Sequence, residues 1–234
     1  MRRLCTICAR GGSTGVVNKN IRLLHGLPLI AHSIRQAQQS GLFDHIAVSS
    51  DSSDILAAAK AYGVRYLVER PAPMATNEAP KLPAIRHCAL EAERMTGIEF
   101  DTVVDLDATA PLRTSGDIAG AVALLEQSGA PNVITGTPSR RSPYFNMVEL
   151  TARGTAVLAK PPSSPIARRQ DAPATYDLNA AVYVWQRDWL VTCTELFNER
   201  TRLFVMAEDR ATDIDTEADF AYVDYLLARK KEHL

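Results

Sequence analysis

A glycine-rich segment near the start of the chain carries residue types suited to binding an anion. Arg10 and Lys19 flank three glycines, and no acidic residue lies between them. Glycines let the backbone turn tightly and bring its N–H groups to a ligand, so this segment could hold a polyphosphate. It contains neither G-x-x-x-x-G-K-[ST] nor G-x-G-x-x-G, which argues against a Walker A loop and a dinucleotide site. A loop that only turns the chain remains an alternative.

Two pairs of aspartates have the spacing of a strand: Asp105 with Asp107, and Asp213 with Asp215. Residues two apart in an extended chain point the same way, so each pair can present both carboxylates to one ion. Mg²⁺ prefers such hard oxygen ligands and takes one or two carboxylates together with phosphate oxygens and water. Helix capping is an alternative for the second pair, because the segment 216–219 resembles a capping box.

The segments that must position these residues alternate between strand and helix. Apolar runs predict strands at 4–9, 43–50, 64–68, 102–107 and 132–137, and helical spacing predicts helices at 27–40, 55–62, 82–95 and 118–125. This order predicts a Rossmann-like three-layer α/β/α fold with a mainly parallel sheet. Ligands bind such sheets beyond the carboxyl ends of the strands, which draws attention to Arg10, 49–51, Arg70 and Asp107.

The alternation stops between residues 138 and 175. This segment contains six prolines and two extended pieces, 145–150 and 155–159, that could pair as a hairpin. It is too short to bury a core of its own, so we expect one domain over 1–234 with an inserted arm at 138–175. Later strands are predicted at 180–185 and 202–206, and a last helix at 217–229.

The composition points away from several classes of protein. The 234 residues carry a formal net charge of −1, which argues against a nucleic-acid-binding protein. No apolar run approaches the roughly 20 residues of a membrane span, and no signal peptide is recognisable, so a cytoplasmic protein is expected. Cys5 and Cys8 have C-x-x-C spacing, but residues three apart in a strand face opposite sides, which favours buried thiols over a metal site.

The opening motif resembles that of the CMP-sialic acid synthetases, the acylneuraminate cytidylyltransferase family. Ala9-Arg10-Gly11-Gly12-Ser13 with Lys19-Asn20 carries this resemblance, although Thr14 stands where the family commonly has lysine. Further family landmarks follow in the right order: Pro28-Leu29-Ile30, Ser49-Ser50-Asp51, Arg70-Pro71, Thr109-Ala110-Pro111-Leu112-Arg113, Tyr176-Asp177-Leu178-Asn179-Ala180-Ala181-Val182-Tyr183 and Asp213-Ile214-Asp215-Thr216. Each landmark is weak alone, but their order along almost the whole chain is specific.

The resemblance implies a cytidylyltransferase that activates a nonulosonic acid with CTP, depends on Mg²⁺ and releases pyrophosphate. It implies catalytic roles for Arg10, Lys19 and Asp215, and a metal site at Asp213 and Asp215. The implied nucleotide-binding residues are Ala9, Arg10, Gly11, Gly12, Ser13, Lys19, Asn20 and Arg70, and the implied sugar-binding residues are Asp107, Arg169 and Asn179.

Departures from the sialic-acid pattern bear on the sugar. Asp107 replaces a glutamine, and Asp177 stands where the sialic-acid enzymes often carry arginine. Segments 79–87 and 143–146 look more like the bacterial legionaminic-acid branch. Alternatives are a ketodeoxyoctonate cytidylyltransferase, another sugar nucleotidyltransferase, or a nucleotide-binding protein without turnover, for which Thr14 and Asp107 are the warning signs.

The resemblance also implies a homodimer formed through the arm at 138–175. Arg169 would then reach the partner's site and clamp the carboxylate of the sugar. Taken alone, the pair Arg168-Arg169 is typical of a solvated surface.

Overall fold

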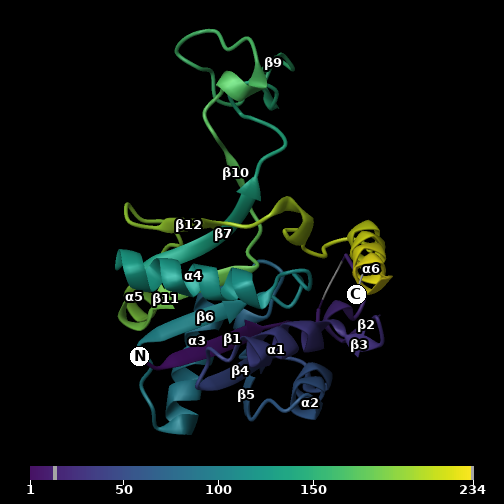
Figure 1. Cartoon of the computed structure of the whole chain (residues 1–234), viewed down its shortest axis with the longest axis vertical. Coiled ribbons are helices and arrows are strands. Elements are labelled where there is room, and N and C mark those ends of the chain that lie inside the picture. The colour runs from purple at the N-terminus through teal and green to yellow at the C-terminus, as the bar shows by residue number, and fades with distance from the viewer. Residues whose placement is uncertain (13–14, 233–234) are drawn as a thin grey trace.

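The structure is a computed structural model that describes residues 1–12 and 15–232. A central sheet lies between two layers of helices, and an arm projects from one end of it (Figure 1). The eight strands of the sheet are β1 (Arg3–Cys8), β4 (His45–Ser50), β5 (Tyr66–Glu69), β6 (Thr102–Leu106), β7 (Asn132–Pro138), β10 (Tyr176–Leu178), β11 (Val182–Gln186) and β12 (Arg202–Val205). Their order is β10-β7-β11-β6-β1-β4-β5, with β12 paired to β7.

The sheet is mixed but mainly parallel, as the sequence predicts. Strands β6, β1, β4 and β5 run parallel, whereas β11 lies antiparallel between β6 and β7. This direction follows from the arm: the chain leaves β7 at its carboxyl end and returns at that same end through β10, so the next strand must run back. The alternation pattern did not predict that β11 runs antiparallel between β6 and β7. The order of elements along the chain does not specify the direction of a strand that follows a long inserted segment.

Helices cover both faces of the sheet. On one face lie α1 (Leu29–Ser40), α2 (Ser53–Ala61) and α4 (Ser115–Ser128), and on the other lie α3 (Lys81–Thr96) and α5 (Arg187–Thr192). Alternate residues of each strand enter the two cores; Cys5 packs into the first core and Cys8 against the second. The prediction that these two thiols face opposite sides of the sheet is therefore confirmed, and all four cysteines are free.

Glycine ends three of these helices. Gly41, Gly97 and Gly129 adopt left-handed φ values of 64°, 66° and 63° directly after α1, α3 and α4. Residues with a Cβ rarely adopt this conformation, which explains why the helices stop there. At its start, α1 is shorter than expected, because Leu27–Pro28 forms a strand, β3, that pairs with β2 (Leu23–Leu24).

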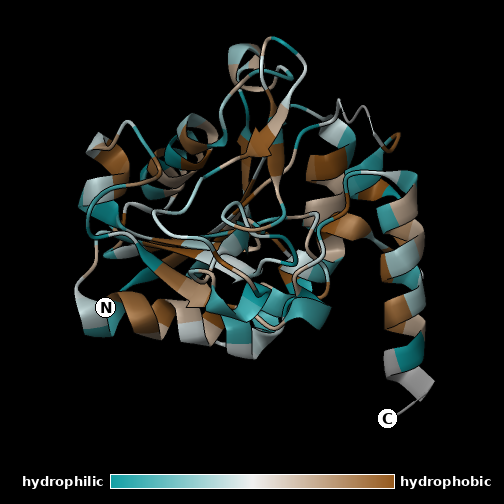
Figure 2. Cartoon of the chain, turned by 90° about the horizontal axis from the view of Figure 1, so that it is seen from above, coloured by the Kyte–Doolittle hydropathy of each residue, from teal (hydrophilic) through white to brown (hydrophobic). Residues whose placement is uncertain are grey.

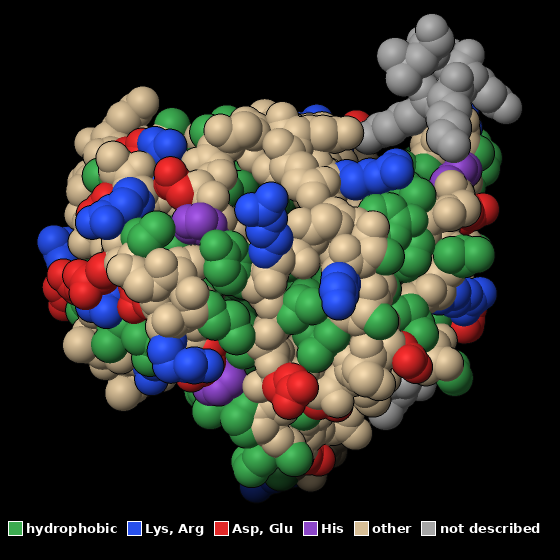
Figure 3. Space-filling model, turned by 90° about the horizontal axis from the view of Figure 1, so that it is seen from below, with side chains coloured by type: hydrophobic (Ala, Val, Ile, Leu, Met, Phe, Trp, Pro, Cys, Tyr) green, Lys and Arg blue, Asp and Glu red, His purple; other side chains and the backbone are tan. Residues whose placement is uncertain are grey.

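The arm contains the predicted hairpin, in which β8 (Val148–Leu150) pairs antiparallel with β9 (Ala156–Leu158). It is joined to the body through β10, which pairs antiparallel with the end of β7 (Figure 1). On the face turned away from the arm, acidic and basic side chains are intermixed (Figure 3).

A third core joins the two ends of the chain. Val16 from the glycine-rich loop packs with Leu29, Ile214 and Phe220, the last from helix α6 (Glu217–Glu232). Figure 2 shows this last helix running along one side of the molecule. Within the described residues, no helix combines the length and apolarity that crossing a bilayer requires. The third core therefore brings the Asp213–Asp215 segment against the loop that follows β1.

Candidate active site

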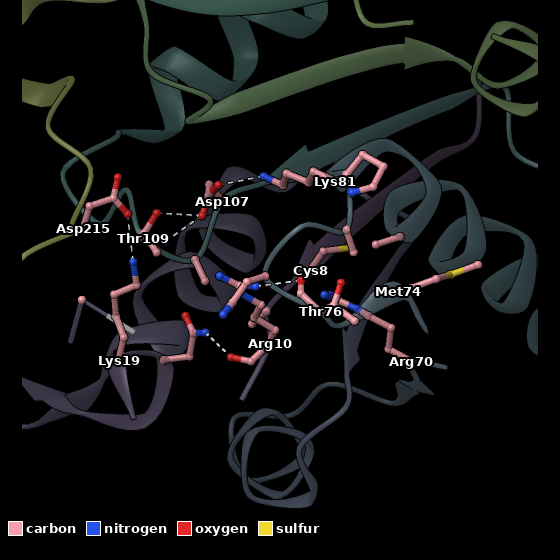
Figure 4. Close-up of a pocket in the computed structure, with 18 residues that line it drawn as sticks. Cys8, Arg10, Lys19, Arg70, Met74, Thr76, Lys81, Asp107, Thr109 and Asp215 are labelled. Carbon is pink, nitrogen blue, oxygen red and sulfur yellow. Dashed lines mark hydrogen bonds and ion pairs between the residues drawn. The ribbon is translucent and has the colours of Figure 1, made fainter. Parts of the chain in front are cut away.

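A cavity of about 470 Å³ opens at the carboxyl ends of β1, β5 and β6, the edge at which the strand order predicts a site (Figure 4). Its walls include Ala9, Arg10, Lys19, Asn20, Arg70, Asp107 and Asp215, all of which the sequence singled out. The cationic segment near the start of the chain and Asp215 near its end thus share one cavity.

The loop after β1 is held by polar contacts on both sides. Asn20 Nδ2 donates to the Arg10 carbonyl at 2.9 Å, and Arg10 Nη1 donates to the Thr76 carbonyl at 2.8 Å across the cavity. The backbone N–H of Gly11 donates to Asp51 Oδ1 at 2.9 Å, so this N–H has an internal partner. Gly11 and Gly12 are not among the residues that line the cavity.

Ser13 and Thr14 lie outside the described residues. The expectation that Ser13 binds nucleotide, and the effect of Thr14 in place of lysine, therefore stay predictions.

Arg70 is buried at the end of β5 and forms another cationic wall of the cavity. Its guanidinium donates to the Ser49 carbonyl at 2.9 Å and to Ser49 Oγ at 3.3 Å. Because Ser49 belongs to the neighbouring strand β4, the sheet itself holds this arginine in place.

Lys19 connects the loop to the C-terminal aspartates. Its Nζ lies 2.5 Å from the Ile214 carbonyl oxygen and 3.1 Å from Asp215 Oδ1. Ile214 is fully buried in the third core and its N–H donates to the Thr109 carbonyl at 2.9 Å. Beside this anchor, Asp215 is exposed and lines the cavity, whereas Asp213 is half-buried and is not among the residues that line it.

Gly15 makes the approach of these two segments possible. A Cβ built at this position would lie 2.1 Å from the Asp215 carbonyl oxygen, far inside van der Waals contact. Only glycine fits where the loop and the Asp215 backbone touch.

The predicted capping box is present at the start of α6. Asp219 Oδ2 accepts from the N–H of Thr216 at 2.7 Å, and the N–H of Asp219 donates to Thr216 Oγ1 at 3.2 Å. These contacts use neither the Asp213 nor the Asp215 carboxylate, so capping does not compete with a metal for them. In the described part of the chain, no group of three or more His, Cys, Asp or Glu residues is arranged to hold a metal ion.

Asp213 is half-buried close to other negative charge. Burial, followed by the charge of Asp215, raises the pKa of the Asp213 carboxyl. When the pKa of a carboxyl is higher in the folded state than in the unfolded state, its ionisation lowers the free energy of unfolding of the protein. This cost is present at neutral pH and vanishes as the pH falls below the unfolded value of about 3.9.

We therefore expect Asp213→Asn to raise the Tm of the metal-free protein by about 1–3 °C near neutral pH, and to have little effect at about pH 3. Thermal unfolding in a chelator, followed by circular dichroism, measures both values. Asp219→Asn is the matched control with the opposite sign, because Thr216 lowers the pKa of Asp219 and the variant should lose stability at neutral pH. A neutral-pH Tm for Asp213→Asn below that of the wild type would contradict this account.

Lys81, which the sequence did not single out as a site residue, completes the opposite wall of the cavity. Its Nζ lies 2.7 Å from Asp107 Oδ2 (Figure 4). It also lies 3.0 Å from Asp105 Oδ2. Burial opposes the charge on Lys81, but the two aspartates outweigh it and raise the pKa of the lysine. Burial likewise opposes ionisation of Asp107, yet Lys81 and Thr109 hold the pKa of Asp107 well below its usual range. Asp107 is thus an ionised acceptor.

The turn that carries Asp107 is held by the buried Arg113. The guanidinium donates to the Ala181 carbonyl at 2.6 Å, to Gln36 Oε1 at 2.9 Å and to Ser33 Oγ. Ser33 Oγ in turn donates to the Asp107 carbonyl at 2.9 Å. One arginine thereby connects helix α1, the turn after β6 and the entry to β11.

Replacing Arg113 with methionine should lower the free energy of unfolding by about 3 kcal/mol or more, because the buried Ala181 carbonyl and Ser33 Oγ and the half-buried Gln36 lose their donor. The urea midpoint measures this loss. Arg94→Met is the matched control: Arg94 is an exposed arginine of α3 that forms a surface ion pair with Glu91, so its removal should not measurably move the midpoint. Equal midpoints for the two variants would contradict the role given to Arg113.

Two residues expected at the sugar do not line this cavity. Asn179 is buried, where its Oδ1 accepts from Thr135 Oγ1 at 2.8 Å and from the Ala181 N–H at 3.2 Å. Arg169 lies in the arm and donates to the Ser139 carbonyl at 2.5 Å. Within one chain, therefore, Asn179 supports the entry to β11, and Arg169 is separated from the cavity.

The sequence profile of the family described as Cytidylyltransferase matches residues 4–221. The chain belongs to the cytidylyltransferase family. Among its relatives, the CMP-N,N'-diacetyllegionaminic acid synthase of Campylobacter jejuni is 45% identical over 227 residues, covering 97% of this chain and 95% of the relative. The synthase of the same name from Legionella pneumophila is 29% identical over 235 residues, covering all of both chains.

Solved structures confirm the fold of this cytidylyltransferase. The structure of CMP:2-keto-3-deoxy-manno-octonic acid synthetase complexed with CTP superposes with a TM-score of 0.72, covering 98% of this chain and 100% of that one. A 4-diphosphocytidyl-2C-methyl-D-erythritol synthase superposes with a TM-score of 0.65. At 18% and 12% identity these two likenesses establish the fold alone.

Proposed function

We propose that this cytidylyltransferase joins CMP from CTP to a nonulosonic acid of the legionaminic type and releases pyrophosphate. The observation that carries the proposal is the single cavity that Arg10, Lys19 and Arg70 share with Asp107 and Asp215. The cations at one wall suit a triphosphate, and the pair formed by Lys81 and Asp107 at the other wall suits a polar sugar. The 45% identity to the Campylobacter jejuni synthase over nearly the whole chain supports the choice of sugar. Because the reaction consumes CTP, we also place the enzyme in the cytoplasm.

In this proposal the chain contributes mainly positioning and electrostatics. The anomeric oxygen of the sugar attacks the α-phosphorus and forms a new P–O bond, while its hydroxyl proton passes to solvent. The bond between the α-phosphorus and the bridging oxygen breaks, and pyrophosphate leaves with the electron pair of that bond. Arg10 and Lys19 offset the negative charge that the phosphates gather in the transition state. Arg70 lies deeper in the cavity, where it would meet the nucleotide base. To act in this way, Arg10 exchanges the Thr76 carbonyl for a phosphate oxygen.

We propose that Asp213 and Asp215 hold Mg²⁺. The donor set fits, because Mg²⁺ commonly takes one or two carboxylates and completes its shell with phosphate oxygens and water. Burial raises the pKa of Asp213, and the charge of Asp215 raises it further; a divalent cation would relieve the second of these effects. When bound, the ion would polarise the phosphoryl group and lower the pKa of the attacking hydroxyl. In the structure, the ion pair with Lys19 partly neutralises the charge of Asp215.

We propose further that the enzyme is a homodimer formed through the arm at 138–175. The arm presents apolar side chains that its own chain does not cover, with Val148 59% and Leu150 75% exposed. Exposed apolar surface on an arm without a core of its own is typical of an interface. Arg169 would then meet the sugar carboxylate bound to the partner. Sedimentation of the wild type and of Leu150→Asp tests the dimer, which only the variant should lose.

Pyrophosphate release with CTP and Mg²⁺ tests the activity. N,N'-diacetyllegionaminic acid should give the highest kcat/KM in a panel that also contains N-acetylneuraminic, pseudaminic and ketodeoxyoctonic acids. GTP, ATP and UTP in place of CTP complete the comparison. A preference for ketodeoxyoctonic acid would identify the protein as a ketodeoxyoctonate cytidylyltransferase. Tight CTP binding without release of pyrophosphate would favour a nucleotide-binding protein without turnover.

A further inference from the structure

The charged couple formed by Lys81 and Asp107 is the part of the cavity wall that the proposed phosphate chemistry does not use. Both side chains line the cavity, and 31% of the Lys81 and 19% of the Asp107 side chain remains exposed. Behind them, Asp105 is fully buried and also accepts from Thr6 Oγ1 at 2.9 Å. The couple therefore faces a ligand on one side and is fixed by buried groups on the other.

Lys81 and Asp107 both keep hydrogen-bonding capacity that contacts within the described part of the chain do not use. Asp107 Oδ1 accepts from the N–H and the hydroxyl of Thr109 at 3.0 and 2.9 Å, and Oδ2 accepts from Lys81. A carboxylate has about four acceptor sites, so one remains, on Oδ2. Lys81 has three N–H donors, and its hydrogen bond to Asp107 uses one of them, whereas its contact with Asp105 is an ion pair. Counted over the described residues, at least one donor on Lys81 and one acceptor on Asp107 remain on neighbouring atoms.

The free acceptor of this wall selects against anions. Asp107 Oδ2 can only accept a hydrogen bond, so the group that meets it must carry a donor, which an ionised phosphate or carboxylate lacks. Arg10, Lys19 and Arg70 line other parts of the same cavity and suit those anions better. The group that meets Lys81 and Asp107 is therefore neutral.

Among neutral groups of a nonulosonic acid, a hydroxyl matches best. An oxygen that both donates and accepts can bond Asp107 Oδ2 and Lys81 Nζ at once, although these atoms lie only 2.7 Å apart. An acetamido group fits poorly, because the N–H and C=O of a trans amide point in opposite directions and cannot both reach adjacent atoms.

We propose that Lys81 and Asp107 together bind one hydroxyl of the sugar, with Lys81 donating to its oxygen and Asp107 accepting its proton. This inference rests on the proposed function and assigns Lys81 a role in sugar specificity. A hydrogen bond to a charged group contributes about 1.5–3 kcal/mol, which corresponds to roughly 10- to 100-fold in kcat/KM.

The test is a cycle of enzyme variants against sugar analogues. Wild type, Lys81→Met and Lys81→Arg are assayed for pyrophosphate release with N,N'-diacetyllegionaminic acid and with analogues that each lack one non-anomeric hydroxyl. For one analogue, the kcat/KM of the wild type should be roughly 10- to 100-fold lower than with the parent sugar. The kcat/KM of Lys81→Met with the parent sugar should already be lower than that of the wild type by about this factor. This variant should lose little more when it is given the analogue. Lys81→Arg should recover part of the discrimination, and the KM for CTP should change little in any variant.

Lys60→Met removes an exposed lysine of α2 and is the matched control, with discrimination equal to that of the wild type. If Lys81→Met does not fold, Asp107→Asn enters the same cycle, since it keeps the size of the side chain and removes its charge. An equal penalty for every deoxy analogue in wild type and variant overturns the inference alone. No turnover of any parent sugar by the wild type overturns the proposed function, and this inference with it.

Discussion

Replacing Asp215 with alanine should lower kcat roughly a hundredfold to a thousandfold while leaving the fold intact. The loss is expected because Asp215 lies in the same cavity as the cations and, in the proposed function, holds the ion that neutralises the phosphates. The fold should survive because 72% of the Asp215 side chain is exposed and the neighbouring Ile214 supplies the buried anchor. Pyrophosphate release gives kcat, and thermal unfolding reports on the fold.

Asp188→Ala is the control for this prediction. Asp188 is a 92% exposed aspartate of α5 that pairs with its neighbour Arg187, so its removal should change neither kcat nor Tm measurably. Full activity of Asp215→Ala would remove this residue from the catalytic set and, with it, the proposed metal site.

Replacing Gly15 with alanine should reduce activity about as severely and also destabilise the protein. The new Cβ would fall 2.1 Å from the Asp215 carbonyl oxygen, which belongs to the backbone and cannot rotate away. The loop and the Asp215 segment must then separate, which costs about 1–3 kcal/mol of overpacking strain and displaces both Lys19 and Asp215. Urea unfolding measures the strain, and the kcat for pyrophosphate release measures the displacement.

Gly116→Ala separates this effect from the general effect of replacing a glycine. Gly116 is exposed in the first turn of α4, and its nearest neighbour would be Thr114 Oγ1 at an ordinary 3.6 Å from the new Cβ. This variant should be as active as the wild type and at least as stable, because alanine favours a helix. If Gly15→Ala behaved like Gly116→Ala, the contact between the loop and Asp215 would not matter for catalysis.

Local patterns in the sequence predicted much of the fold and part of the site. Apolar runs, helical spacing and terminal glycines such as Gly41 are decided within a few residues, so most helices and strands lie close to their predicted places. The rule that ligands bind at the carboxyl ends of parallel strands then led directly to Arg10, Arg70 and Asp107, which line one cavity. The capping box at Thr216 could also be predicted, because its two residues lie only three positions apart.

Contacts between distant parts of the chain were decided only by the tertiary structure. Lys81 meets Asp107 across 26 residues, and Lys19 meets Asp215 across 196, and neither spacing has a period that a sequence pattern could reveal. The antiparallel insertion of β11 and the need for glycine at position 15 likewise depend on where remote segments pack. The sequence by itself determined most of the helices and strands and, through glycines such as Gly41, where several helices end. Packing decided which charges face each other, because burial and Coulomb attraction act through space and not along the chain.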